Sequence, residues 1–223
     1  MKNGKIKAII FDFDGLMVNT EELRLLSFEE FIKTHGKKFK KVDYVKTMPG
    51  SAEETTQLLK DLYSLEGDIA ILNQQRRDIF KNLFDNRLVF MEGVAELLVR
   101  IKNWDVKCAV ASGRRRGDIV DALTRFDVID QFETIVSLED LAISKGKPDP
   151  EIYLIAAKRL GLDPKFCLAL EDSPFGIDSA KAAGMRAVYV PDARFFDLHH
   201  EKADIILKNL GELTDDILEM LAK

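Results

Sequence analysis

The sequence of 223 residues has few cysteines, no excess of basic residues and no long apolar run. Cys108 and Cys167 each lie inside a short apolar segment and lack metal-ligand spacing, which predicts buried, reduced thiols. The formal net charge is −5, so no basic field favours nucleic acid as a partner. No apolar span reaches the length of a membrane helix. These absences argue against a disulfide scaffold, a nucleic-acid-binding protein and a membrane protein, and they favour a cytoplasmic one.

Hydrophobic residues make up 46% of the chain and charged residues 32%, an ordinary balance for a globular protein. An apolar run at residues 6–11 predicts a buried strand. Residues 21–90 then show helical patterns and no convincing strand. From residue 91 onward, strands alternate with helices. We predict strands at 106–111, 134–136, 166–170, 187–190 and 203–207, and helices at 94–101, 117–126, 150–160, 176–184 and 210–221.

This alternation predicts an α/β fold with a doubly wound, mostly parallel sheet, a Rossmann-like core. Residues 1–17 and 90–223 are expected to form that core. Residues 18–89 are expected to form an inserted, all-helical cap domain. Within it, Ser51 and Glu54 have the spacing of a capping box, which predicts a helix that begins after Ser51.

Polar side chains gather where the predicted strands end. Because the carboxyl ends of parallel strands share one edge of a sheet, four segments distant in sequence converge on one site. The residues in these segments are Asp12, Asp14, Ser112, Lys147, Glu171 and Asp172.

Four carboxylates at one site would repel one another and raise their proton affinities. A divalent cation together with Lys147 would relieve that repulsion, and oxygen ligands suit Mg²⁺. Each segment alone also has a plain structural interpretation. Ser112 and Gly113 fit a strand-to-helix turn, Glu171 and Asp172 fit a helix N-terminus, and lysines in loops are usually solvated. It is the combination that favours a catalytic site.

Taken together, four segments resemble the haloacid dehalogenase-like hydrolase superfamily, in its β-phosphoglucomutase-like branch with a helical cap. These segments are Asp12–Thr20, Ala111–Gly113, Gly146–Pro150 and Glu171–Ile177. The resemblance implies a phosphoric monoester hydrolase whose substrate is a small phosphorylated metabolite. Asp12 would be the nucleophile that forms an aspartyl-phosphate, and Asp14 the general acid and base.

The same resemblance assigns phosphate binding and the metal site. Ser112, Gly113 and Lys147 would bind the phosphate group. Asp12, the backbone carbonyl of Asp14, and Asp172 would ligate Mg²⁺, with Glu171 as a further ligand or as a partner of the ligands. The cation, the lysine and the backbone donors would stabilise charge on the transferring group.

Candidate substrate contacts lie outside these motifs. Arg114, Arg115 and Arg116 follow the Ser112 segment directly and could contact an anionic substrate, although a solvated basic face is the plainer interpretation for Arg115 and Arg116. In the predicted cap, Arg24 and Glu21 are the candidate contacts. Nothing in the sequence demands a partner chain, so we expect a monomer.

Three functions remain open from the sequence. A phosphatase of sugar phosphates is favoured over a sugar-phosphate mutase. The mutase pattern has a histidine where this chain has Arg24, and an arginine after the cap glycine. In this chain the segment after Gly50, Ser51 to Glu54, contains two acids and no arginine. A catalytically silent phosphate-binding scaffold is the third alternative. Asn19 replaces an aspartate found in many relatives, a change expected to act on the cap hinge rather than on the nucleophile.

Overall fold

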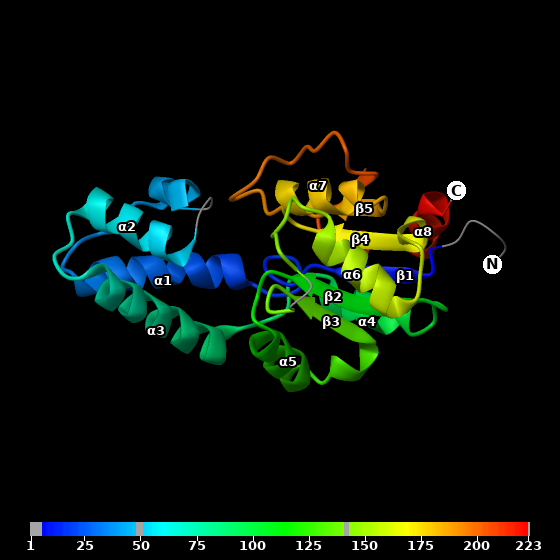
Figure 1. The fold of residues 1–223 in the computed structure, drawn as a ribbon, viewed down its shortest axis with the longest axis horizontal. Coiled ribbons are helices and arrows are strands. Elements are labelled where there is room, and N and C mark those ends of the chain that lie inside the picture. Colours follow the sequence, from blue (N-terminus) through cyan, green and yellow to red (C-terminus); the bar gives the residue numbers. More distant parts are fainter. Residues whose placement is uncertain (1–5, 48–50, 141–142, 223) are drawn as a thin grey trace. The chain divides into compact units, whose positions relative to one another are not determined.

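The computed structural model describes residues 6–47, 51–140 and 143–222. The chain divides into two compact units, residues 1–18 with 90–223, which we call the core, and residues 19–89, which we call the cap. Figure 1 shows the strands in the core and a set of helices in the cap. Gly50, which precedes the predicted start of the second cap helix, lies outside the described residues.

The core contains a six-stranded sheet with the strand order β3-β2-β1-β4-β5-β6. Every pairing between neighbouring strands is parallel. This topology confirms the predicted doubly wound α/β fold, and it is the Rossmann strand order. The strands are β1 (Ala8–Phe11), β2 (Lys107–Ser112), β3 (Thr134–Ser137), β4 (Cys167–Glu171), β5 (Arg186–Tyr189) and β6 (Ile205–Ile206).

The first strand, β1, lies between β2 and β4 at the centre of the sheet. All four residues of Ala8–Phe11 are fully buried. A strand buried on both faces needs no alternation of polar and apolar residues, which explains the continuous apolar run in the sequence.

Five α-helices belong to the core: α4 (Val94–Ile101), α5 (Arg116–Arg125), α6 (Glu151–Leu160), α7 (Pro174–Ala182) and α8 (Asp215–Leu221). Helix α6 packs on β1, β2 and β3, and α7 packs on β4 and β5. In Figure 1, α6 lies in front of the sheet. Small side chains such as Ala109, Ala169, Ala156 and Ala180 meet in this layer. They let helix and strand backbones approach closely.

Two predicted elements near the C-terminus differ from the structure. The strand predicted at 203–207 is only Ile205–Ile206, an edge strand that pairs with β5 alone. The helix predicted at 210–221 is a 3₁₀ helix, Leu210–Glu212, followed by α8. Leu213 between them has extended backbone, with ψ of 90°. The short turn is stabilised instead by Asn209, whose Oδ1 accepts a hydrogen bond from the Gly211 amide at 2.9 Å.

Asp140 lies in the loop after β3 and joins three elements. Its carboxylate accepts hydrogen bonds from Arg116 on α5, Arg159 on α6 and the Ser137 amide. Burial opposes the charge on Asp140, but the hydrogen bonds from Arg159, Ser137 and Arg116 outweigh it and lower the pKa of the carboxyl group. The charged network therefore ties α5 and α6 to the end of β3.

Cys108 and Cys167 lie in β2 and β4, where both are buried and free. Burial raises the pKa of Cys108 to about 12 and that of Cys167 to about 11. This confirms the predicted buried thiols. None of the helices within the described ranges has the length and apolar character needed to cross a membrane.

The cap consists mainly of α1 (Thr20–Thr34), α2 (Ala52–Tyr63) and α3 (Ile69–Arg87), and α3 packs against both other helices. Its interior includes the aromatic rings of Phe28, Phe39, Tyr44 and Tyr63. The predicted capping box is confirmed. Ser51 Oγ accepts from the Glu54 amide at 3.2 Å, and the Glu54 carboxylate accepts from the Ser51 amide at 2.6 Å.

Asn19 joins the first and last segments of the cap. Its Oδ1 accepts a hydrogen bond from the Val89 amide at 3.0 Å, and its Nδ2 donates to the Arg87 carbonyl at 3.4 Å. The side chain is almost fully buried. An aspartate could make the first of these bonds but not the second, because an ionised carboxylate has no donor.

Candidate active site

The site lies where the strand order of the sheet reverses, at the carboxyl ends of β1 and β4. In doubly wound sheets, ligands bind at this point. Asp12 follows β1, and its amide donates to the Leu170 carbonyl of β4 at 3.0 Å. Glu171 is the last residue of β4, and Asp172 comes directly after it. The sheet therefore brings together residues that are about 160 positions apart in the sequence.

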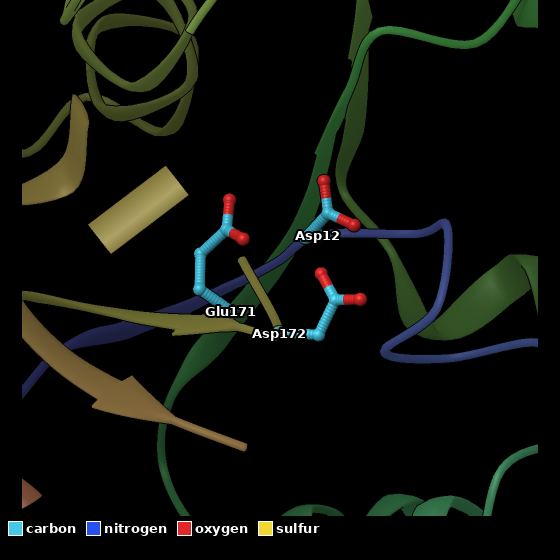
Figure 2. A group of neighbouring side chains, drawn as sticks. All are labelled: Asp12, Glu171 and Asp172. Atoms are coloured by element: carbon cyan, nitrogen blue, oxygen red, sulfur yellow. The ribbon is translucent and has the colours of Figure 1, made fainter. Parts of the chain in front are cut away.

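Asp12, Glu171 and Asp172 form a buried acidic cluster. One carboxylate oxygen from each residue lies within 4.8 Å of the others. Figure 2 shows the three carboxylates grouped around a common space. Exposure of the residues is only 6%, 0% and 4%, respectively. Such a concentration of buried negative charge requires cationic compensation.

Lys147 supplies part of that compensation from the loop before α6. Its Nζ donates to Asp12 Oδ1 and to Glu171 Oε1, both at 2.5 Å, and to the Ala111 carbonyl at 3.1 Å. Burial opposes the charge on the lysine, but Asp12 and Glu171 outweigh it and raise the pKa of Lys147. Lys147 therefore stays charged between the two carboxylates.

One lysine does not balance the cluster. Burial raises the pKa of Asp12, Lys147 opposes this rise, and Glu171 and Asp14 add to it. A divalent cation beside Asp12 would act in the opposite direction, since positive charge favours the carboxylate. The donor set consists of hard oxygens and matches what Mg²⁺ prefers.

Glu171 is held by more partners than the sequence indicated. Oε1 also accepts from the buried Tyr153 hydroxyl at 2.6 Å, and Oε2 accepts from Ser173 Oγ at 3.2 Å. Tyr153 lies on the buried face of α6. Sequence reasoning missed it because a tyrosine within an apolar helical pattern is read as core. The available signal is that a buried tyrosine hydroxyl needs a hydrogen-bond partner.

Gly176 in the first turn of α7 faces Glu171 directly. A Cβ atom at Gly176 would lie 1.8 Å from Glu171 Cδ. Ser173 Oγ accepts a hydrogen bond from the Gly176 amide at 3.0 Å and so fixes the start of the helix. Glycine at this position is therefore what leaves room for the Glu171 carboxylate.

A second group, centred on Asp14, lies at the ends of β1 and β2. Ser112 Oγ contacts Asp14 Oδ2 at 3.3 Å, and the Arg114 amide donates to Ser112 Oγ at 3.1 Å. Gly113 between them is exposed. The Asp14 side chain is not one of the three grouped carboxylates; the expectation for Asp14 as a ligand concerns its backbone carbonyl.

Arg114, a candidate substrate contact, binds Asp14. Its Nε and Nη2 both lie 2.7 Å from Asp14 Oδ1. In the cap, Arg24 Nη1 lies 3.6 Å from Glu21 Oε1, and the Arg24 guanidinium lies over the Tyr44 ring. Glu21 also accepts a hydrogen bond from the Tyr44 hydroxyl at 2.5 Å. Arg24 and Glu21 thus form one cluster, and their role toward a substrate stays a prediction.

Comparison with known proteins identifies the family. Residues 9–190 match the haloacid dehalogenase-like hydrolase family. The chain belongs to this family. The predicted resemblance is confirmed, and so is the enzyme class, a haloacid dehalogenase-like phosphatase.

The chain is similar to several known proteins over most of its length. The phosphorylated carbohydrates phosphatase of Thermotoga maritima is 28% identical over 184 residues, which cover 82% of this chain and 84% of that protein. The β-phosphoglucomutase of Bacillus subtilis is 31% identical over 223 residues, covering 96% and 94%. The solved structure of CbbY from Rhodobacter sphaeroides in complex with phosphate has a TM-score of 0.76 at 28% identity, covering 96% and 99%.

Proposed function

We propose that this hydrolase is a Mg²⁺-dependent phosphatase of small phosphomonoesters, chiefly sugar phosphates, and that it acts through an aspartyl-phosphate. The observation that carries the proposal is the buried Asp12, held by Lys147 beside Glu171 and Asp172 at the reversal point of the sheet. The similarity to a phosphatase of phosphorylated carbohydrates supports the substrate class.

Asp12 is the proposed nucleophile. In the first step an Asp12 oxygen forms a bond to phosphorus, and the bond from phosphorus to the substrate's ester oxygen breaks. Lys147 contacts Asp12 Oδ1, so it orients this carboxylate and places a positive charge beside the phosphate. Water then attacks phosphorus, which releases phosphate and restores the Asp12 carboxylate.

Asp14 is the proposed acid and base of the two steps. It gives a proton to the leaving alkoxide in the first step and takes one from water in the second. Ser112 lies beside Asp14, and we propose that its hydroxyl and the Gly113 amide bind phosphate oxygens.

The metal ligands are proposed from the hydrogen bonds of the acidic cluster. Glu171 Oε1 accepts hydrogen bonds from Lys147 and Tyr153, and Oε2 accepts one from Ser173, which supports a role for Glu171 in orienting Lys147. Asp12 and Asp172 are then the side chains that ligate Mg²⁺. When bound, Mg²⁺ would neutralise charge on the transferring group.

A sugar-phosphate mutase is the second candidate, because this chain is also similar to a β-phosphoglucomutase over nearly its whole length. Mutase chemistry needs cationic groups that hold a second phosphate group. Arg24 lies close to Glu21, and the segment Ser51 to Glu54 has two acids and lacks the arginine of the mutase pattern. Acidic side chains near both positions disfavour binding of a second phosphate group and so favour the phosphatase.

The proposal is tested with p-nitrophenyl phosphate and a panel of sugar phosphates, each with and without Mg²⁺. We expect Mg²⁺-dependent phosphate release that Asp12→Asn abolishes. Asp163→Asn makes the same chemical change at an exposed position of the core and should leave activity intact. Full activity in Asp12→Asn would overturn the nucleophile assignment. Conversion of β-glucose 1-phosphate to the 6-phosphate with a bisphosphate activator, without net phosphate release, would instead establish the mutase.

A further inference from the structure

The two oxygens of the Asp14 carboxylate have different surroundings. Oδ1 lies 2.7 Å from both Nε and Nη2 of Arg114. Oδ2 lies 3.3 Å from the Ser112 hydroxyl. Oδ1 therefore contacts two nitrogen atoms of a charged guanidinium group, and Oδ2 contacts the Ser112 hydroxyl at the proposed phosphate site.

Arg114 is itself held in place. Its amide donates to Ser112 Oγ, and its Nη1 lies 3.7 Å from Asp118 Oδ2 in the first turn of α5. Its side chain is only 15% exposed. An arginine fixed at both its backbone and its guanidinium restricts the rotation of the carboxylate that it contacts.

We propose that Arg114 is a positioning residue for Asp14, one that selects Oδ2 as the oxygen that transfers the proton. This inference rests on the proposed phosphatase function. A proton on Oδ1 would point at the N–H groups of Arg114, and two donors cannot face each other in a hydrogen bond. Oδ2, on the side of Ser112, is therefore the oxygen through which Asp14 can transfer a proton.

In the first step the proton leaves Asp14 Oδ2 for the ester oxygen of the substrate while that oxygen separates from phosphorus. The Asp14 carboxylate that results keeps Oδ1 on Arg114. In the second step a water molecule gives its proton back to Oδ2 as its oxygen bonds to phosphorus.

The leaving group of the substrate separates this role from a structural one. The p-nitrophenolate of p-nitrophenyl phosphate leaves without a proton, whereas the alkoxide of glycerol 2-phosphate needs one. Water attack on phosphorylated Asp12 is common to both substrates, whereas kcat/KM reports the transfer of the phosphoryl group to Asp12, in which they differ. Loss of Arg114 should therefore lower kcat/KM selectively on glycerol 2-phosphate. A loss of folding or of phosphate binding would harm both reactions equally.

The experiment measures kcat/KM on both substrates for the wild type, Arg114→Met, Arg114→Lys and Arg115→Met. We expect Arg114→Met to lower kcat/KM on glycerol 2-phosphate by about tenfold or more, with kcat/KM on p-nitrophenyl phosphate within about threefold of wild type. Arg114→Lys keeps the charge but not the two-pronged contact, so its loss should be intermediate. Arg115 is adjacent, has the same charge and is 70% exposed in its side chain, and its substitution should change neither reaction.

Equal losses of kcat/KM on both substrates in Arg114→Met, or no loss on either, would overturn the positioning role. If Arg114→Met fails to fold, Arg114→Lys decides: a wild-type ratio of the two kcat/KM values would overturn the proposal. Failure of the underlying phosphatase function looks different, because the wild-type protein would then hydrolyse neither substrate.

Discussion

Replacement of Gly176 by alanine is a sharp test of how the candidate site is built. Gly176 lies in α7, where alanine normally stabilises a helix by about 1 kcal/mol relative to glycine. In this structure, however, the added Cβ would lie 1.8 Å from Glu171 Cδ and 2.0 Å from each carboxylate oxygen. For the stability of Gly176→Ala, helix propensity therefore predicts a gain and packing predicts a loss.

The size of the effect follows from what holds Glu171. Ordinary contact begins at 3.4 Å, so the carboxylate would have to move by 1.6 Å (3.4 minus 1.8). Glu171 is fully buried and is bonded to Lys147 at 2.5 Å and to Tyr153 at 2.6 Å. A shift of that size breaks these bonds, and disruption of a buried charge pair costs about 3–5 kcal/mol. After subtraction of the helix gain, we expect Gly176→Ala to destabilise the protein by about 2–4 kcal/mol.

Urea unfolding of the full chain, followed by circular dichroism, measures this difference. Gly117→Ala is the matched control, because Gly117 is also helical, in α5, and a Cβ there would meet nothing within 4 Å. That variant should be as stable as wild type or more stable, by up to about 1 kcal/mol. Phosphatase activity should fall in Gly176→Ala and persist in Gly117→Ala.

Two results would refute this reasoning. One is a Gly176→Ala variant as stable as wild type, which would mean that the Glu171 side chain can move away from the added methyl group without loss of stability. The other comes from a double-mutant cycle with Glu171→Ala, which removes the group that the new methyl would strike. In the Glu171→Ala background, Gly176→Ala should not lower the free energy of unfolding. An undiminished loss of stability would show that the added methyl group clashes with something other than Glu171.

Three further substitutions test other contacts. Tyr153→Phe removes the hydrogen bond to Glu171 and should lower the free energy of unfolding by about 1–3 kcal/mol; unchanged urea unfolding would contradict the contact. Asp140→Asn should cost about 1–2 kcal/mol at neutral pH. Because the folded-state pKa of Asp140 is lowered, its contribution is complete above the unfolded pKa of about 4 and is lost as pH falls through the folded value, so the gap between wild type and variant should close in acid. A gap that stays constant down to the acid unfolding limit would refute this role. Asn19→Asp loses the bond to the Arg87 carbonyl and should lower the free energy of unfolding by about 0.5–1.5 kcal/mol, which is measured as a lower melting temperature; an unchanged melting temperature would argue against that bond.

Much of the fold could be predicted because its signals are local. The apolar run before Asp12 is continuous since β1 is buried on both faces, and the Ser51 capping box marks the start of α2 in four residues. The break between Leu210–Glu212 and α8 could not be predicted in this way. The Leu210–Glu212 turn packs against Gly93, whose backbone approaches Gly211 so closely that a Cβ would lie 2.0 Å from the Gly211 amide. That contact joins segments more than a hundred residues apart.

The candidate site, too, could be predicted from the sequence only in part. The residues at the strand ends could be found because topology brings the ends of parallel strands together. Their mutual contacts could not, since the sequence does not show which side chain meets which. The contact of Arg114 with Asp14 and the hydrogen bond of Tyr153 to Glu171 are two examples.

The central claim is that Asp12 becomes phosphorylated during turnover. The most direct measurement is acid quenching of the enzyme while it hydrolyses p-nitrophenyl phosphate with Mg²⁺, followed by mass spectrometry of the intact protein and its peptides. We predict a fraction of the chain heavier by one phosphoryl group, with the label on the peptide that contains Asp12, and no such species in Asp12→Asn. Turnover without any phosphorylated enzyme, or a label on another residue, would contradict the account.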